Sequence, residues 1–229
     1  MSEQQSQGTR RRDAFANAKL YVCVTARKER GDLREFLHAA YEGGVDIIQL
    51  RDKKLEAAAE IEAIEVLGEV AREHGKLFAV NDRADVAMLT GADVFHVGQG
   101  DLTTPQARQL LGDDVIIGRS CLSREQVDGA IADEGLDYFC TGPVWETPTK
   151  PGRAAVGLKL PKYAAEHAGD KPFFAIGGID AERLPSVLET ARHGSLWSGQ
   201  SRTRPTLRLP LASCGNSCNY VVLGSQFSG

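Results

Sequence analysis

The sequence has no uninterrupted apolar run approaching the ~20 residues that a membrane-spanning helix needs. Residues 1–18 contain basic side chains with no apolar segment behind them, so they lack the pattern of a secretory signal peptide. We expect these residues to form a mobile polar lead-in to a folded domain at residues 19–190, followed by an atypical segment at 191–229. These absences predict a cytoplasmic protein with no membrane partner.

Cysteine is scarce, and its five residues form no paired framework. Cys23, Cys121 and Cys140 lie inside strand-like segments, as expected for reduced thiols that behave as small buried hydrophobic groups. Cys214 and Cys218 make a single C-x₃-C pair with no second pair and no nearby histidine ligand, which argues against a metal site there.

The chain also lacks an excess of positive charge, because its formal net charge is −4 at pH 7. This balance argues against a nucleic-acid partner. The charge is unevenly distributed: residues 1–189 hold 23 basic and 31 acidic side chains, whereas the last 40 residues hold four arginines and no acid. There is no P-loop or G-x-G-x-x-G motif, and no Ser-His-Asp or Cys-His arrangement suggests itself.

What the sequence does contain is a regular alternation of short apolar, β-branched runs with longer segments at helical spacing, which indicates βα units around a parallel sheet. The runs are nearly continuous in apolar character, as expected for strands covered on both faces. Seven such units favour an α/β fold of the TIM (β/α)₈ barrel type, with a doubly wound open sheet as the alternative. The expected strands are residues 20–25, 46–52, 77–82, 94–99, 115–120, 138–144 and 173–179.

A regular eighth βα unit cannot be found. Residues 191–229 are rich in Ser, Arg, Gly and Pro, and only YVVLG at 220–224 has the composition of a strand. A frameshift near the codon for Ala191 would produce such an abrupt change. We therefore expect 191–229 to be mostly irregular, with the eighth unit missing or improvised. The first and seventh strands would then have exposed edges, which favour association into a homo-oligomer.

Charged residues follow several of the expected strands, at the edge where parallel α/β folds bind their ligands. Asp82 and Asp101 follow the third and fourth strands, which lie about 4.8 Å apart, so the two carboxylates can share one cation. Mg²⁺ typically takes one or two carboxylates together with substrate phosphate oxygens. Arg51, Lys53 and Lys150 would add positive charge toward a phosphate. Each aspartate alone fits a turn or helix cap and each cation a surface residue, but together they favour a Mg²⁺-dependent phosphate site.

Two further features allow both a functional and a structural explanation. Gly177 and Gly178 end the seventh strand, where glycine lets a ligand approach the backbone and leaves amides to bind an anion; a plain tight turn is the alternative. His96 lies within a strand, and we expect it to be a hydrogen-bonded core residue rather than a catalyst.

Six motifs follow one another along residues 20–190: QLRDK (49–53), ND (81–82), GQGD (98–101), GRS (118–120), GPVWETPTKPG (142–152) and AIGGI (175–179). In order and spacing they resemble those of the thiamine-phosphate synthase family. This resemblance implies a TIM barrel that couples an aminopyrimidine diphosphate with a thiazole phosphate, giving thiamine phosphate and pyrophosphate. It also implies that the diphosphate leaves first and that the thiazole nitrogen captures the resulting cation.

The resemblance also implies a role for each motif. Asp82 and Asp101 would hold Mg²⁺ on the diphosphate, and Lys150, Ser120 and Arg51 would be the catalytic residues. Gln49 and Asn81 would orient the pyrimidine, whereas Thr147, Thr149 and the amide of Gly178 would hold the thiazole phosphate. The substrate-binding residues would be Gln49, Leu50, Arg51, Asp52, Lys53, Asn81, Ser120, Thr147, Pro148, Thr149, Lys150 and Gly178.

Two alternatives to a working synthase follow from the same sequence. The related thiazole tautomerases share the barrel and some loops, and such an enzyme would need neither the pyrimidine diphosphate nor Mg²⁺. The altered segment after Ala191 is also compatible with a non-catalytic protein that binds thiamine phosphate. In each case the expected partners are small molecules.

Overall fold

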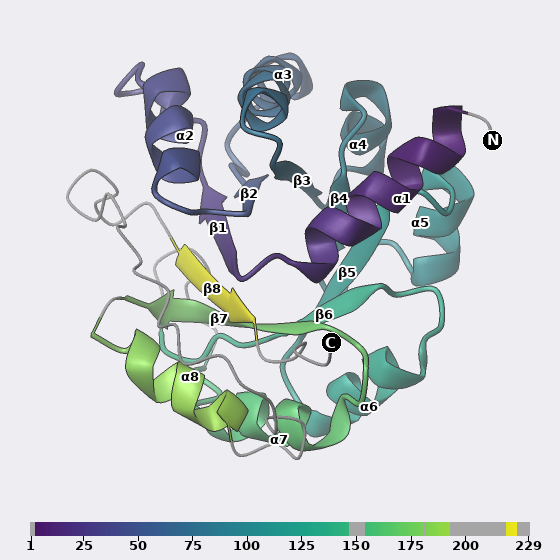
Figure 1. Cartoon of the computed structure of the whole chain (residues 1–229), viewed down its shortest axis with the longest axis vertical. Coiled ribbons are helices and arrows are strands. Elements are labelled where there is room, and N and C mark those ends of the chain that lie inside the picture. Colours follow the sequence, from purple (N-terminus) through teal and green to yellow (C-terminus); the bar gives the residue numbers. More distant parts are fainter. Residues whose placement is uncertain (1–2, 147–153, 181, 193–218, 224–229) are drawn as a thin grey trace.

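The computed structural model shows an α/β fold built around one curved sheet (Figure 1). It describes residues 3–146, 154–180, 182–192 and 219–223. Strands β1 to β7 pair with their neighbours in sequence, and every one of these pairs is parallel. All seven strands expected from the sequence are confirmed. They are β1 (Leu20–Val24), β2 (Ile47–Leu50), β3 (Leu77–Asn81), β4 (Val94–Val97), β5 (Ile116–Cys121), β6 (Tyr138–Thr141) and β7 (Phe173–Ile179).

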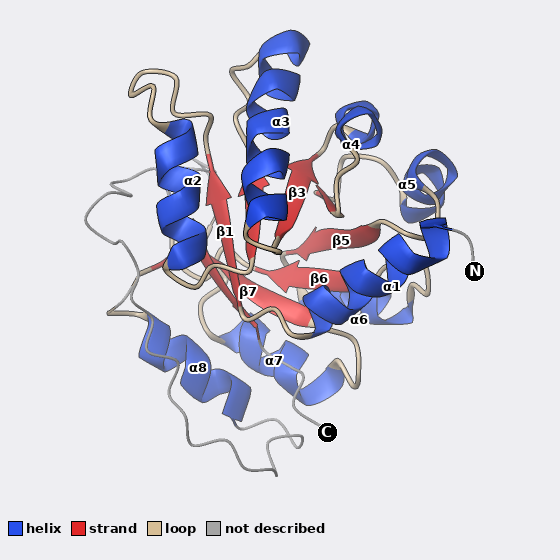
Figure 2. Ribbon diagram, turned by 45° about the horizontal axis from the view of Figure 1, so that its top comes forward, coloured by secondary structure: helices blue, strands red, loops and turns tan. Residues whose placement is uncertain are grey.

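A helix follows each of these strands and packs on the outside of the sheet (Figure 2). The local sequence accounts for several of the helix ends. Thr103 and Gln106 form a reciprocal capping box at the start of α5, and the Ser123 side chain caps α6. The helices are α2 (Leu33–Glu42), α3 (Ala57–Glu73), α4 (Ala84–Thr90), α5 (Thr104–Leu111), α6 (Arg124–Ala132), α7 (Lys159–His167) and α8 (Leu184–Arg192).

An eighth strand, β8 (Asn219–Leu223), lies between β1 and β7 and is antiparallel to both (Figure 1). The strand order is therefore closed, and the expectation that β1 and β7 have exposed edges is wrong. Backbone pairing accounts for the difference, because an antiparallel strand satisfies the N–H and C=O groups of both edges without a regular βα crossover. The structural basis that we expected for self-association is thereby removed. Residues 193–218 lie outside the described part of the chain.

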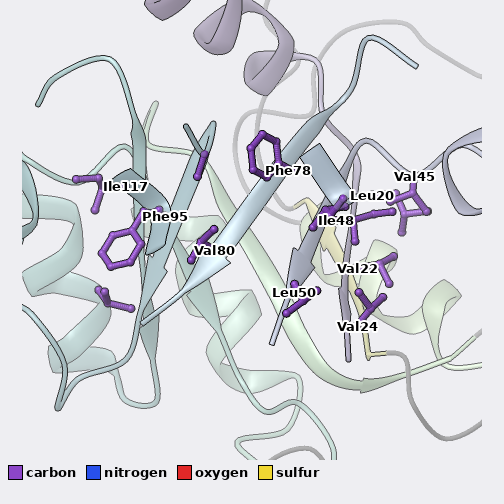
Figure 3. Packing of buried hydrophobic residues seen from close by; sticks show 14 of the residues in the cluster. Leu20, Val22, Val24, Val45, Ile48, Leu50, Phe78, Val80, Phe95 and Ile117 are labelled. Carbon is purple, nitrogen blue, oxygen red and sulfur yellow. The ribbon is translucent and has the colours of Figure 1, made fainter. Parts of the chain in front are cut away.

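The apolar core has two layers, which follow from the alternation of side chains along each strand. Residues such as Leu50, Val80 and Phe95 point outward and pack under the helices (Figure 3). Residues such as Tyr21 and Tyr138 point into the barrel interior. The outer layer supplies most of the buried apolar surface, at about 1.5–3 kcal/mol for each fully buried large side chain.

The N-terminal segment forms a helix, α1 (Glu3–Ala16), so the expectation of a mobile lead-in is wrong. Phe15 is buried against the rings of Tyr138 and Phe174, with centroid distances of 5.0 and 5.9 Å. Arg11 adds an ion pair with Asp93 at 2.9 Å. One aromatic side chain therefore anchors an otherwise polar helix across the amino ends of the strands (Figure 2).

Cys23, Cys121 and Cys140 are buried thiols outside any disulfide, as expected. Burial raises the pKa of the Cys121 thiol to about 12, which keeps it protonated and unreactive. Cys214 and Cys218 lie outside the described residues. In the part of the chain that the structure describes, no helix combines the length and apolar character needed to cross a bilayer.

Candidate active site

The carboxyl ends of β2 and β3 bring two predicted pyrimidine-orienting residues into contact. Gln49 and Asn81 are both buried, and Gln49 Nε2 donates a hydrogen bond of 2.8 Å to Asn81 Oδ1. Gln49 Oε1 accepts from the hydroxyl of Tyr21 at 3.1 Å and from the thiol of Cys23 at 3.0 Å. These bonds fix the orientation of both amides before any ligand binds.

Asp82 follows β3 in the left-handed region, with φ at 60°. Aspartate tolerates this conformation better than most residues, and a backbone held there commonly marks a functional position. Its amide donates to His96 O at 2.9 Å, which ties the turn to β4. Lys53 Nζ lies 3.1 Å from Asp82 Oδ2, and the Asp82 side chain also interacts with Asp101. The two predicted metal ligands are therefore neighbours.

The charge of Asp82 is controlled by this environment. Burial alone would raise the pKa of the Asp82 carboxyl, but hydrogen bonds and charge from Lys53, with further hydrogen bonds from Asp101 and Asn81, lower it overall. Asp101 is held by the Gly98 amide, which donates to Asp101 Oδ2 at 2.8 Å. A Cβ at Gly98 would lie 2.8 Å from the same oxygen, so only glycine fits this loop without rearrangement.

The remaining residues of the QLRDK motif divide between the site and the scaffold. Leu50 is fully buried in the outer core, which leaves only its backbone for contact with a ligand (Figure 3). The Asp52 carboxylate accepts hydrogen bonds from the amides of Ala26 at 3.3 Å and Lys54 at 3.2 Å, so it organises the loops after β1 and β2. Arg51 follows β2 directly, and its amide donates to Val24 O at 2.8 Å.

Ser120 lies on β5 with its hydroxyl 2.9 Å from His96 Nε2. Both residues are buried, so the expectation that His96 is a hydrogen-bonded core residue is confirmed. The other ring nitrogen, His96 Nδ1, lies 3.0 Å from the hydroxyl of Tyr138. Tyr138 occupies the space that a side chain at Gly118 would need, because a Cβ there would lie 2.1 Å from the tyrosine ring.

Tyr138 and Tyr21 are residues that sequence reasoning missed. Their hydroxyl groups are 3.4 Å apart and connect the Ser120–His96 pair with Gln49. In the sequence both are ordinary aromatic residues within apolar strands. The one available signal was the alternation of side chains along each strand, which predicts that both tyrosines point into the barrel.

Glu60, near the start of α3, is a second residue that sequence reasoning missed. It is buried, and its carboxylate lies 3.7 Å from Arg83 Nη1. Burial raises the pKa of Glu60; Arg83 opposes the shift, and the nearby aspartates, including Asp82, add to it. An acid in the first turn of a helix is common, so the sequence carried no signal that would have singled it out.

Gly178 lies in β7 with φ at 64°, beside the loop that follows β6. A Cβ at Gly178 would approach Trp145 Cβ to 2.8 Å, so the backbones pack closely here. Arg183, also missed from the sequence, donates to Gly178 O at 2.7 Å and lies 5.2 Å above the ring of Trp145. The predicted site residues Thr147, Pro148, Thr149 and Lys150 lie outside the described residues.

The donors near Asp82 suit a hard cation. Asp82 and Asp101 offer carboxylate oxygens, which Mg²⁺ prefers, and such ions commonly bind one or two carboxylates plus substrate oxygens. Within the described ranges, no group of three histidine, cysteine or acidic side chains could form a complete protein cage for a metal. The residues therefore fit a Mg²⁺ ion shared with a phosphate-bearing ligand.

Comparison with known proteins identifies the class to which this fold and site belong. Residues 20–195 match the family model described as thiamine monophosphate synthase. This match spans more than three quarters of the chain, and the chain belongs to that family. It ends at Ser195, close to Ala191, where the sequence pattern changes.

Individual relatives agree with the family match. A thiamine-phosphate synthase from Streptomyces avermitilis is 57% identical over 178 residues, which cover 78% of this chain and 83% of the relative. One from Acidothermus cellulolyticus is 53% identical over 176 residues, with 77% and 83% covered. Among solved structures, thiamine phosphate pyrophosphorylase from Pyrococcus furiosus is similar with a TM-score of 0.65 and 32% identity, covering 74% of this chain and 80% of that chain.

Proposed function

We propose that this chain is a transferase that couples 4-amino-2-methyl-5-(diphosphooxymethyl)pyrimidine with a thiazole phosphate. The products are thiamine phosphate and pyrophosphate. Membership of the thiamine monophosphate synthase family over residues 20–195 carries this proposal. The arrangement of Asp82, Asp101 and Lys53 supports it, because two carboxylates and a cation at the sheet edge suit a diphosphate and its metal.

Asp82 and Asp101 would hold Mg²⁺, which when bound neutralises negative charge on the leaving diphosphate. Lys53 is 62% exposed while its partner Asp82 is 21% exposed, so the lysine can turn from the carboxylate toward a phosphate. Arg51 adds a permanent charge with a geometry suited to phosphate. Lys150 is proposed to act on the same diphosphate, and Asp52 to hold the loop that carries Arg51 and Lys53.

The reaction needs positioning and charge stabilisation more than a strong base. The C–O bond to the diphosphate breaks and the electron pair leaves with it; the thiazole nitrogen then donates its lone pair to the pyrimidine methylene carbon. Gln49 and Asn81, with the backbone of Leu50, are proposed to orient the pyrimidine. Ser120 would lie near the reacting centre. Thr147, Pro148, Thr149 and the Gly178 amide are proposed to hold the thiazole phosphate.

Two broader assignments belong to the same proposal. The fold is a (β/α)₈-type barrel whose eighth unit is irregular, supported by seven parallel strands and an antiparallel β8. The protein acts in the cytoplasm on small-molecule substrates, with no nucleic-acid or membrane partner. Self-association was predicted from exposed edges on β1 and β7. Because β8 pairs with both edges, self-association is not part of this proposal and remains an untested prediction.

Omission of single components tests the proposed function. Pyrophosphate release should require the pyrimidine diphosphate, the thiazole phosphate and Mg²⁺ together. Isomerisation of the thiazole phosphate alone, without pyrophosphate release, would identify a tautomerase instead. Binding of thiamine phosphate with no turnover of either substrate would identify a non-catalytic protein.

A further inference from the structure

A chain of side-chain hydrogen bonds crosses the barrel interior from Asn81 to Ser120. We propose that this chain has a single hydrogen-bond direction, set by the side-chain amide of Gln49, and that Tyr138 is a positioning residue that commits the Ser120 hydroxyl as a donor to His96. The consequence for catalysis rests on the proposed function, whereas the direction itself does not.

The direction begins at Gln49, because the nitrogen of a side-chain amide only donates hydrogen bonds and its oxygen only accepts them. Gln49 Nε2 donates to Asn81 Oδ1 at 2.8 Å. This fixes Gln49 Oε1 on the opposite side, where it accepts from the Cys23 thiol at 3.0 Å.

The hydroxyl groups of Tyr21 and Tyr138 continue the chain with the same donor-to-acceptor order. Tyr21 uses its single proton to donate to Gln49 Oε1 at 3.1 Å, so its oxygen can only accept from Tyr138. The two phenol oxygens are 3.4 Å apart, which makes this the longest link of the chain. Burial raises the pKa of both phenols well above the ordinary value, so each keeps the proton that the chain requires.

The hydrogen bond with Tyr138 determines which ring nitrogen of His96 carries the proton. Because Tyr138 donates to Tyr21, its oxygen must accept from His96 Nδ1, 3.0 Å away. The imidazole proton therefore lies on Nδ1, and the lone pair of Nε2 accepts from the Ser120 hydroxyl at 2.9 Å. The second ring nitrogen of a histidine is set in this way by the bond that the first one makes.

Because the Ser120 hydroxyl donates its only proton to His96, its oxygen can offer a ligand only lone pairs. Such an oxygen favours a donor group or a developing positive charge on a ligand, and it disfavours a second acceptor. In the proposed reaction a positive charge develops on the pyrimidine once the diphosphate leaves. The Gln49 side-chain amide on β2 thus determines whether the Ser120 hydroxyl on β5 donates or accepts.

Packing holds Tyr138 in the position that this role needs. Gly118 leaves room for its ring on one side, and the Phe15 ring of α1 packs against it at a centroid distance of 5.0 Å. Tyr138→Phe keeps the ring and removes only the hydroxyl. Tyr41→Phe is a matched control, because the buried Tyr41 hydroxyl donates to Leu77 O at 2.9 Å outside this chain of bonds.

The first test measures the imidazole ¹⁵N chemical shifts of the full-length protein at pH 7.5, with His96→Gln identifying the resonance among the five histidines. We expect a neutral His96 protonated on Nδ1 in the wild type and in Tyr41→Phe, and loss of this single tautomer in Tyr138→Phe. A wild-type His96 protonated on Nε2, or on both nitrogens, would overturn the proposal. This measurement decides the direction even if the protein releases no pyrophosphate.

The second test is kinetic. Tyr138→Phe should lower kcat for pyrophosphate release about tenfold, with KM changed by less than about twofold, whereas Tyr41→Phe should leave kcat unchanged. Because Tyr138 acts through Ser120, adding Tyr138→Phe to Ser120→Ala should cause no further loss. Additive losses in the double variant, or equal kcat values for Tyr138→Phe and Tyr41→Phe, would contradict the positioning role.

Discussion

Lys53 Nζ lies 3.1 Å from Asp82 Oδ2, so the cation that follows β2 is paired with the carboxylate that follows β3. The pair is open to solvent on the lysine side and half-buried on the aspartate side. An exposed pair of this kind contributes only about 0.2–1 kcal/mol to stability. We propose that the pair instead serves to place opposite charges where a diphosphate and its cation can separate them.

Asp82→Asn should reduce kcat/KM at least about tenfold, or roughly 1.4 kcal/mol of transition-state stabilisation, because an amide is a poor ligand for Mg²⁺. Asparagine tolerates the left-handed backbone at this position, so the melting temperature should change little. Asp82→Ala should lose the same activity and also stability, because alanine is strained at φ of 60°. Normal turnover by Asp82→Asn across a Mg²⁺ titration would remove this residue from the metal site.

Glu60→Gln should raise the melting temperature at pH 7, because burial disfavours the charged form of this carboxylate. The folded pKa of Glu60 lies above the unfolded value, so its contribution to stability is present below about pH 4.3 and is lost as pH rises through the folded pKa. The difference between wild type and variant should therefore vanish below about pH 4. Glu62→Gln, on an exposed position of the same helix, is the control. An equal shift in both variants, or one independent of pH, would contradict this account.

Phe15→Ala should destabilise the protein by about 3 kcal/mol, because the side chain is buried between Tyr138 and Phe174 at the end of the barrel. Arg10→Ala, on an exposed position of α1, should leave the free energy of unfolding unchanged within about 0.5 kcal/mol. Urea unfolding of both variants measures the difference. Equal stability of the two would mean that α1 does not dock and that residues 1–18 are the mobile lead-in that the sequence suggested.

The backbone amides of β8 should exchange with solvent at least about tenfold more slowly than an unstructured peptide of the same sequence. The reason is that β8 pairs with both β1 and β7. Hydrogen exchange followed by mass spectrometry can compare residues 219–223 with β4, which is paired on both sides and should be slow. Exchange at the free-peptide rate in 219–223 would return β1 and β7 to the exposed edges expected from the sequence.

The seven parallel strands were predictable because apolar runs and helical spacing depend on local sequence. The meeting of Asp82 with Asp101 was predictable for a related reason, since neighbouring parallel strands end at the same edge. Docking of α1 was not, because a single residue, Phe15, provides its anchor and no apolar stripe marks the helix. The direction of β8 was not predictable either, because composition alone cannot distinguish a parallel from an antiparallel strand.

The buried hydrogen bonds in the barrel interior could not be predicted from the sequence either. They depend on the inward packing of Tyr138 into the space beside Gly118, which is a property of the closed barrel and not of either segment alone. The residues that this network positions were nevertheless named from the motifs, since Gln49, Asn81 and Ser120 all belong to it. Sequence reasoning thus named three candidate site residues that share this network and missed the two tyrosines, Tyr21 and Tyr138, that connect them.

Simultaneous measurement of thiamine phosphate and pyrophosphate tests the central claim most directly. With the full-length protein, both substrates and Mg²⁺, the account predicts that the two products accumulate in equal amounts. It also predicts that both disappear when the thiazole phosphate, the pyrimidine diphosphate or Mg²⁺ is left out. A folded wild-type protein that forms no thiamine phosphate under these conditions would contradict the proposed function.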